Sequence, residues 1–164
     1  MNNIILIGMP SSGKSTLGKI LARRLGYAFL DADDVIKEQN GCELQDIIDR
    51  DGLEVFRRRE EEALCSICTN GTVIATGGSA IYCSAGMEHL RSIGRVVYLK
   101  IPYEVMEKRV GDPRVRGIAI APGATFRDLY EERVPFYERY ADLTFSENDD
   151  DSFAQMAEEL LKLL

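Results

Sequence analysis

The residues with the clearest chemical meaning form a short loop near the start of the chain. They follow the pattern G-x-x-x-x-G-K-[ST] and read Gly8-Met9-Pro10-Ser11-Ser12-Gly13-Lys14-Ser15. An apolar run precedes this loop and a helical pattern follows it, which is the setting in which the pattern binds phosphate. Backbone N–H groups of such a loop surround an anion, and the positive end of the following helix points at it. The pattern therefore predicts binding of a nucleoside triphosphate.

Two side chains of the loop have roles that follow from its chemistry. The Lys14 ammonium can reach the β- and γ-phosphates, and the Ser15 hydroxyl can bind Mg²⁺. The alternative is a glycine-rich turn that only joins a strand to a helix and leaves Lys14 in solvent. Four specified residues in the right setting rarely coincide by chance, so we interpret the loop as a phosphate site.

Two carboxylates follow the next apolar run. Asp31 and Asp33 are two residues apart at the end of a predicted strand, so their side chains point to the same side. One carboxylate could hold Mg²⁺ through water, while the other accepts a proton from an attacking hydroxyl. The alternative is that Asp33 or Asp34 only caps the helix that follows.

Three consecutive arginines lie on a later predicted helix. Arg57 to Arg59 spread through roughly 200° of its circumference, so they cannot all face one ligand. We expect most of them to pair at the surface with Glu60 to Glu62. One could bind a carboxylate through its planar guanidinium, but the spacing does not select which one.

Composition excludes several classes of protein. The chain has 164 residues, which predicts one domain over residues 1–164, and its formal net charge of −7 disfavours nucleic acid and anionic membranes as partners. The first apolar run, Ile4 to Ile7, is too short for a signal peptide or a membrane helix. We therefore expect a cytoplasmic protein with neither a nucleic acid nor a membrane as partner.

The cysteines do not indicate a zinc site. Cys65 and Cys68 have C-x-x-C spacing, but there is no second close pair, and His89 is the sole histidine. Since these two cysteines fall within a predicted helix, we expect buried or half-buried reduced thiols.

Short β-branched runs alternate with amphipathic segments along the chain, which predicts an α/β fold with a parallel sheet covered by helices on both faces. The expected strands are residues 3–7, 27–30, 73–76, 95–101 and 143–145, and the expected helices include 14–25 and 53–68. Thr125 with Asp128, and Ser152 with Gln155, predict capping boxes that open two further helices. The segment from about 111 to 124 matches neither the helical nor the strand periodicity, and we interpret it as a lid.

Several motifs, in order, resemble the shikimate kinase family of small P-loop kinases related to nucleoside monophosphate kinases. The resemblance extends from Asn3 to about Phe145. Its motifs are Gly8 to Thr16, Leu30-Asp31-Ala32-Asp33, Gly52-Leu53-Glu54-Val55-Phe56-Arg57 with Glu60, Thr76-Gly77-Gly78, Val97-Tyr98-Leu99, Lys108-Arg109 and Glu132-Arg133-Val134-Pro135-Phe136-Tyr137.

The resemblance implies a three-layer α/β/α fold, a five-stranded parallel sheet of order 2-3-1-4-5, and a monomer. It also implies ATP and Mg²⁺ as cofactors, and transfer of the γ-phosphoryl group to a hydroxyl of shikimate, giving shikimate 3-phosphate. The partner would be a small molecule with a hydroxyl and a carboxylate. The nucleotide would be bound by Gly8, Pro10, Ser11, Ser12, Gly13, Lys14, Ser15, Thr16 and Arg109, the last of these against adenine.

By the same resemblance, Asp33 orients or deprotonates the acceptor hydroxyl, and Asp31 joins Ser15 in the Mg²⁺ shell. Arg57 and Arg133 bind the acceptor carboxylate, and the backbone of Gly77 and Gly78 contacts a ring hydroxyl. Two alternatives stay open: Arg133 could instead pair with Glu132 or Glu138, and Arg109 could be a solvated helix end.

Two departures from the family pattern concern the acceptor. Ser79 replaces the family's third glycine, which puts a side chain where backbone would approach the ring, and the lid lacks the usual Arg-Pro-Leu-Leu. Arg114 and Arg116 are therefore rival candidates for the lid cation that approaches the transferred phosphate. Alternatives are a related kinase acting on another small hydroxy-carboxylate such as homoserine, with Ser79 as an extra polar contact, and a non-catalytic ATP-binding module.

Overall fold

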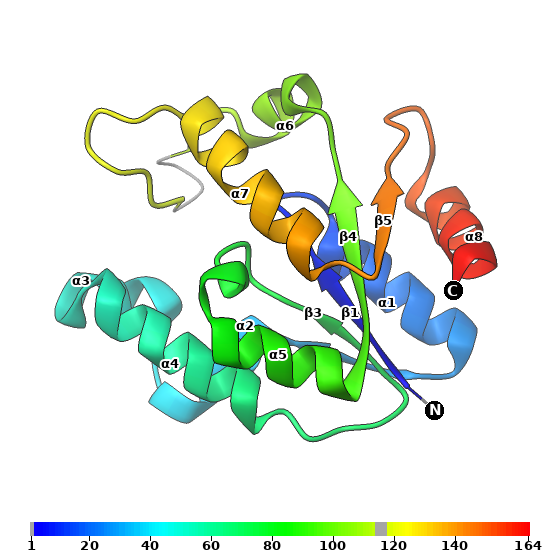
Figure 1. Cartoon of the computed structure of the whole chain (residues 1–164), viewed down its shortest axis with the longest axis horizontal. Coiled ribbons are helices and arrows are strands. Elements are labelled where there is room, and N and C mark those ends of the chain that lie inside the picture. The colour runs from blue at the N-terminus through cyan, green and yellow to red at the C-terminus, as the bar shows by residue number, and fades with distance from the viewer. Residues whose placement is uncertain (1, 114–117) are drawn as a thin grey trace.

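The computed structural model describes residues 2–113 and 118–164 of the chain. Its centre is a five-stranded parallel sheet with the strand order β2-β3-β1-β4-β5, which confirms the expected α/β class and order (Figure 1). The strands are β1 (Asn3–Ile7), β2 (Ala28–Asp31), β3 (Thr72–Ala75), β4 (Gly94–Lys100) and β5 (Leu143–Ser146). The helices are α1 (Lys14–Leu25), α2 (Ala32–Asn40), α3 (Leu44–Asp51), α4 (Leu53–Ser66), the short 3-10 helix η1 (Ala80–Tyr82), α5 (Ser84–Ile93), α6 (Tyr103–Val110), α7 (Phe126–Tyr140) and α8 (Phe153–Leu163).

Strand β1 is the central strand of the sheet, and all five of its residues are buried. Side chains alternate between the two faces of a strand. Ile5 and Ile7 accordingly pack in one core cluster, while Ile4 and Leu6 pack in another. A strand that is apolar on both faces is buried on both faces only when it lies between two layers of helices, as the sequence predicts.

The two layers of helices differ in composition and in role. One face is covered by α1 and α8 through Leu17, Leu21, Met156, Ala157 and Leu160. The other face is covered mainly by α5, α6 and α7, through Met87, Leu90, Met106, Val110, Tyr137 and Tyr140. A third, smaller cluster joins α2, α3 and α4 through Ile36, Ile47, Phe56 and Ala63, to one side of the sheet in Figure 1.

The parallel arrangement places the chemistry-bearing residues together. Since parallel strands end at the same edge of a sheet, the loop after β1, Asp31 at the end of β2 and the glycines after β3 all lie at one edge. This edge is where the sequence predicts the site.

Cys65 and Cys68 are free thiols, as predicted, but the predicted burial is wrong, because both are exposed. The core-facing residues of α4 are Phe56, Glu60, Ala63 and Leu64, so Cys65 is turned toward solvent. Helix α4 ends at Ser66, two residues before the predicted end, and Cys68 therefore lies beyond it. None of the helices formed by residues 2–113 and 118–164 is long and apolar enough to span a membrane.

Candidate active site

The loop between β1 and α1 has the backbone of an anion cradle. Ser11 and Gly13 have φ angles of 62° and 87°, and Ser11 is the one residue other than glycine with a positive φ among those described. A Cβ on Gly13 would lie 2.6 Å from the Phe153 ring, so this position admits only glycine. Ser12 is buried in the loop, while Thr16 lies exposed in the first turn of α1.

Lys14 lies across this loop. Its Nζ donates to the carbonyl oxygens of Gly8 at 2.8 Å and Met9 at 2.7 Å, and to Ser12 Oγ at 3.2 Å. Burial lowers the pKa of Lys14 to about 8, although the nearby carboxylates of Asp33 and Asp31 oppose this shift. A bound phosphate would supply the negative charge that this buried ammonium lacks.

Asp31 links the phosphate loop to the start of α2. Its Oδ1 accepts from the backbone N–H of Asp33 at 3.0 Å, and its Oδ2 accepts from Ser15 Oγ at 2.9 Å. The helix cap is therefore Asp31, and the alternative that Asp33 or Asp34 serves only as the cap is wrong. The Asp33 carboxylate is instead one wall of a cavity, where burial, and then the charge of Asp31, raise its pKa.

The Ser15 hydroxyl and the Asp31 carboxylate form a hard oxygen pair that fits Mg²⁺, which proteins bind through one or two carboxylates together with substrate phosphates. In the part of the chain that the structure describes, no group of three or more His, Cys, Asp or Glu side chains could hold a metal ion.

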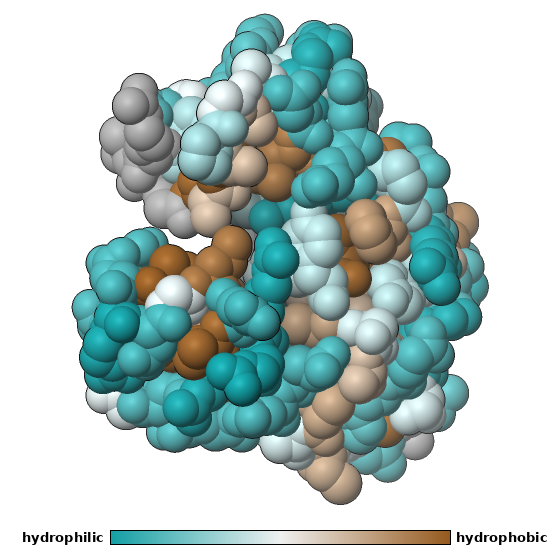
Figure 2. Space-filling model, turned by 60° about the vertical axis from the view of Figure 1, so that its left-hand side comes forward, coloured by the Kyte–Doolittle hydropathy of each residue, from teal (hydrophilic) through white to brown (hydrophobic). Residues whose placement is uncertain are grey.

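A cavity of about 880 Å³ adjoins the phosphate loop. Figure 2 shows it as a hollow with hydrophobic side chains on both sides. Its apolar walls are Leu44, Ile48, Leu53, Phe56, Ile118, Ile120 and Leu129, and its charged residues include Asp33, Lys37, Arg57, Glu60 and Arg133. Apolar walls with a few charged groups are typical of a site for a small molecule.

Two guanidiniums share this cavity. The Arg57 and Arg133 guanidinium carbons lie 4.5 Å and 5.5 Å from the centroid of the Tyr82 ring. Arg133 is 6% exposed, and its Nε is buried with no hydrogen-bond partner among the described residues. A buried donor of this kind is costly unless a ligand satisfies it, and a carboxylate is the ligand that matches a guanidinium.

The alternative pairings of Arg133 are wrong. Glu132 accepts from the Tyr82 hydroxyl at 2.6 Å, and Glu138 pairs with Lys100 at 3.1 Å. The structure also selects among the three arginines of α4, because Arg57 lines the cavity while Arg58 lines a separate recess beside Cys65.

The segment after β3 forms the floor between the loop and the cavity. A Cβ on Gly78 would lie 2.6 Å from Pro10 Cδ and 3.0 Å from Arg133 Nη1. The Gly78 carbonyl accepts from the Tyr137 hydroxyl at 2.7 Å, while Ser79 Oγ donates to Glu60 Oε2 at 2.8 Å. The phosphate loop and the cation pair therefore meet at Gly78.

The sequence analysis does not predict the positions that two residues take in the site. Tyr82 holds both guanidiniums, and no spacing pattern indicates it. Glu60 is expected at the surface but is 1% exposed. Its signal is present in the sequence, because Phe56, Glu60, Ala63 and Leu64 follow the helical spacing of a buried face.

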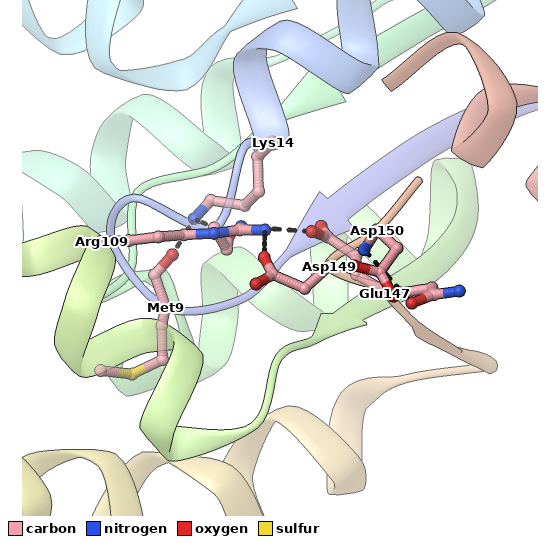
Figure 3. Close-up of polar contacts among 8 residues, drawn as sticks. Met9, Lys14, Arg109, Glu147, Asp149 and Asp150 are labelled. Atoms are coloured by element: carbon pink, nitrogen blue, oxygen red, sulfur yellow. Dashed lines mark hydrogen bonds and ion pairs between the residues drawn. The ribbon is translucent and has the colours of Figure 1, made fainter. Parts of the chain in front are cut away.

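Arg109 is not a solvated helix end, so that alternative is wrong. Its Nη1 lies 3.2 Å from Glu147 Oε2 and its Nη2 lies 3.3 Å from Asp149 Oδ1. Figure 3 shows the Arg109 side chain extending from α6 to these two carboxylates. Its contact with adenine stays a prediction.

The predicted lid is described in part. Residues 118–122 and 124 line the cavity, opposite the α3 and α4 side chains. Both candidates for the lid cation, Arg114 and Arg116, lie outside the described residues.

Comparison with known proteins finds relatives over nearly the whole chain. A family model described as Shikimate kinase matches residues 10–164. The chain is 38% identical over 166 residues to the shikimate kinase of Moorella thermoacetica, covering 99% of this chain and 94% of that protein. It is also 38% identical over 167 residues to the shikimate kinase of Pseudomonas paraeruginosa, covering 100% of this chain and 96% of that protein.

Solved structures are similar as well. The shikimate kinase from Acinetobacter baumannii, in complex with shikimate, has a TM-score of 0.87 and 33% sequence identity, covering 99% of this chain and 92% of that one. A gluconokinase from Sinorhizobium meliloti, with a TM-score of 0.56 and 19% identity over 98% of this chain and 90% of that one, is similar in fold alone.

The contact at Gly78 predicts that Gly78→Ala weakens ATP binding at least about ten-fold, since its methyl would press on Pro10 of the phosphate loop. Titration calorimetry with ATP and Mg²⁺ measures this. Gly41→Ala is the control. Its Cβ would meet no atom within 4 Å, and its φ of 67° means that alanine there destabilises the fold at a place far from the phosphate loop. An unchanged ATP affinity in Gly78→Ala would contradict the contact.

Proposed function

The chain belongs to the shikimate kinase family, and from this premise we propose that it transfers the γ-phosphoryl group of ATP to a hydroxyl of shikimate, giving shikimate 3-phosphate. The observation that carries the proposal is the position of Gly78, whose missing side chain lets Pro10 of the phosphate loop and Arg133 of the cation pair approach one another. Donor and acceptor sites that adjoin in this way favour direct transfer between two bound substrates.

The acceptor is held by charge and shape. Arg57 and Arg133, which both lie near the Tyr82 ring, would bind the shikimate carboxylate, and the Arg133 Nε would gain the partner it lacks. The backbone of Gly77 and Gly78 would contact a ring hydroxyl. The apolar walls of the cavity exclude water that would otherwise compete for the phosphoryl group.

Asp33 is the group we assign to the acceptor hydroxyl. Its carboxylate lines the cavity, and its raised pKa improves its capacity to accept a proton at neutral pH. Lys14 would neutralise the negative charge that develops on the transferred group, which is the main requirement of phosphoryl transfer.

Ser15 and Asp31 would hold Mg²⁺, and the ion, when bound, supplies charge neutralisation at the phosphate oxygens. Arg109, fixed by Glu147 and Asp149, would lie against adenine. Residues 118–124 would cover the acceptor as part of a lid within a single domain. We also propose a cytoplasmic monomer.

An assay of ADP release, with a panel of hydroxy-carboxylates, tests the proposed function. We expect turnover with shikimate and little with homoserine. The Ser79 hydroxyl, which was the reason to consider a smaller acceptor, is already engaged with Glu60. Selective turnover of homoserine would contradict the choice of acceptor, and ATP binding without any transfer would favour a non-catalytic module.

The cation pair predicts an effect on acceptor binding. Arg57→Ala and Arg133→Ala should each raise the KM for shikimate about 100-fold or more, because a charge-assisted contact with the carboxylate is lost. Arg57→Lys should also be harmful, since an ammonium cannot replace a planar fork. Steady-state kinetics with Arg58→Ala as control, one residue away and outside the cavity, measures the difference. Near-normal KM values in Arg57→Ala and Arg133→Ala would contradict the assignment of these arginines to the acceptor carboxylate.

The role of Asp33 predicts an effect on turnover. Asp33→Asn keeps the size of the side chain but cannot accept a proton, so kcat should fall about 10²- to 10⁴-fold with a smaller change in KM. Asp34→Asn is the matched control, because Asp34 is the next residue of α2 and is exposed. An equal loss of kcat in the two variants would contradict a catalytic role of Asp33.

A further inference from the structure

Ser79, the residue that departs from the family pattern, forms a hydrogen bond with a buried carboxylate of the acceptor cavity. The serine lies directly after the two glycines that follow β3, at the start of η1. Its hydroxyl donates to Oε2 of Glu60 across a distance of 2.8 Å. A glycine at this position could not form this hydrogen bond.

Glu60 belongs to the wall of the acceptor cavity although it is almost completely buried. It is 1% exposed and lines the same cavity as Arg57 and Arg133. Its second oxygen, Oε1, faces Gly77: a Cβ there would lie 3.2 Å from this oxygen and 3.0 Å from Asp33 Oδ1. The carboxylate is therefore held between the floor of the cavity and the residues that we assign to the acceptor.

Several ionisable groups face Glu60 from the surrounding elements. They are Asp33 on α2, Arg57 on α4, Cys83 before α5, and Arg133 and Tyr137 on α7. Burial raises the pKa of Glu60 to about 7, the Ser79 hydrogen bond acts against this shift, Asp33 adds to it, and the two arginines oppose it. The charge beside the cation pair therefore changes near neutral pH.

We propose that Ser79 is a positioning residue that acts through Glu60: its hydroxyl keeps the Glu60 carboxylate ionised beside the arginine pair and so limits the affinity for the acceptor carboxylate. The inference rests on the proposed function, because it concerns the site of the same acceptor. An anionic Glu60 offsets part of the positive potential of Arg57 and Arg133. Protonation of Glu60 restores that potential, so the acceptor binds more tightly at lower pH.

The test is the KM for shikimate between pH 6 and 9 at saturating ATP and Mg²⁺, with titration calorimetry of shikimate as a second measurement. In the unmodified protein we expect KM to rise about three- to ten-fold with pH, with its midpoint near 7. Ser79→Ala should move this midpoint up by about one pH unit, because the ionised carboxylate loses a hydrogen bond. Ser79→Thr retains the hydroxyl and should restore the original midpoint.

Glu60→Gln removes the titrating group while it keeps the shape, and its KM should be low and independent of pH. Ser92→Ala is the control, because its hydroxyl donates to His89 O on an exposed helix surface away from the cavity. If Ser79→Ala does not fold, Ser79→Gly replaces it.

An unshifted midpoint in Ser79→Ala, or a KM that does not change with pH in the unmodified protein, would overturn the inference while the proposed function stands. Absence of shikimate phosphorylation in the unmodified protein would instead defeat the proposed function itself.

Discussion

Burial of charge at one edge of the sheet is the constraint that the rest of this structure has to satisfy. Lys14, Glu60, Arg133 and Glu147 are each at most 8% exposed, and an ionised side chain removed from water costs several kcal/mol unless partners compensate. The cations and anions alternate around the phosphate loop and the cavity, so each offsets part of the cost of its neighbours. The compensation is incomplete where a ligand is needed, as the buried Nε of Arg133 shows. The charges of bound substrates would complete this balance, so the same electrostatic interactions would contribute to affinity and to specificity.

The parallel sheet makes this concentration of charge possible. Every strand ends at the same edge, so residues from β1, β2 and β3 converge without long connecting loops, while the apolar faces of β1 anchor the edge between two layers of helices. Helices α2 and α4, which share a small core cluster with α3, carry Asp33, Arg57 and Glu60. The acceptor cavity is thus lined both by these helices and by α7, which carries Arg133.

The sequence predicts the sheet and the phosphate loop well because both depend on short-range patterns. Short apolar runs and one loop motif specify them, and the resemblance to a family supplies the strand order. The spacing of residues does not predict the position of a side chain that depends on contacts with residues far away in the sequence. The Tyr82 ring lies near arginines from two helices, and Asp31, not its neighbours, caps α2 while its other oxygen accepts from Ser15. The helical pattern of α4 shows that Glu60 lies on the buried face of the helix. It does not show which residues Glu60 contacts, so its role could not be predicted from the sequence.

Ser79 shows why a departure from a family pattern cannot be interpreted from size alone. A serine in place of glycine suggests a smaller acceptor site, because a side chain is added where backbone would approach the ring. In the structure that side chain turns to Glu60, so the hydroxyl alters the balance of charge around the cavity. The serine fits here because the buried Glu60 carboxylate accepts its hydrogen bond. On the proposal made above, a substitution at the floor of the site would adjust acceptor binding through electrostatics, without any change in the residues assigned to contact the acceptor.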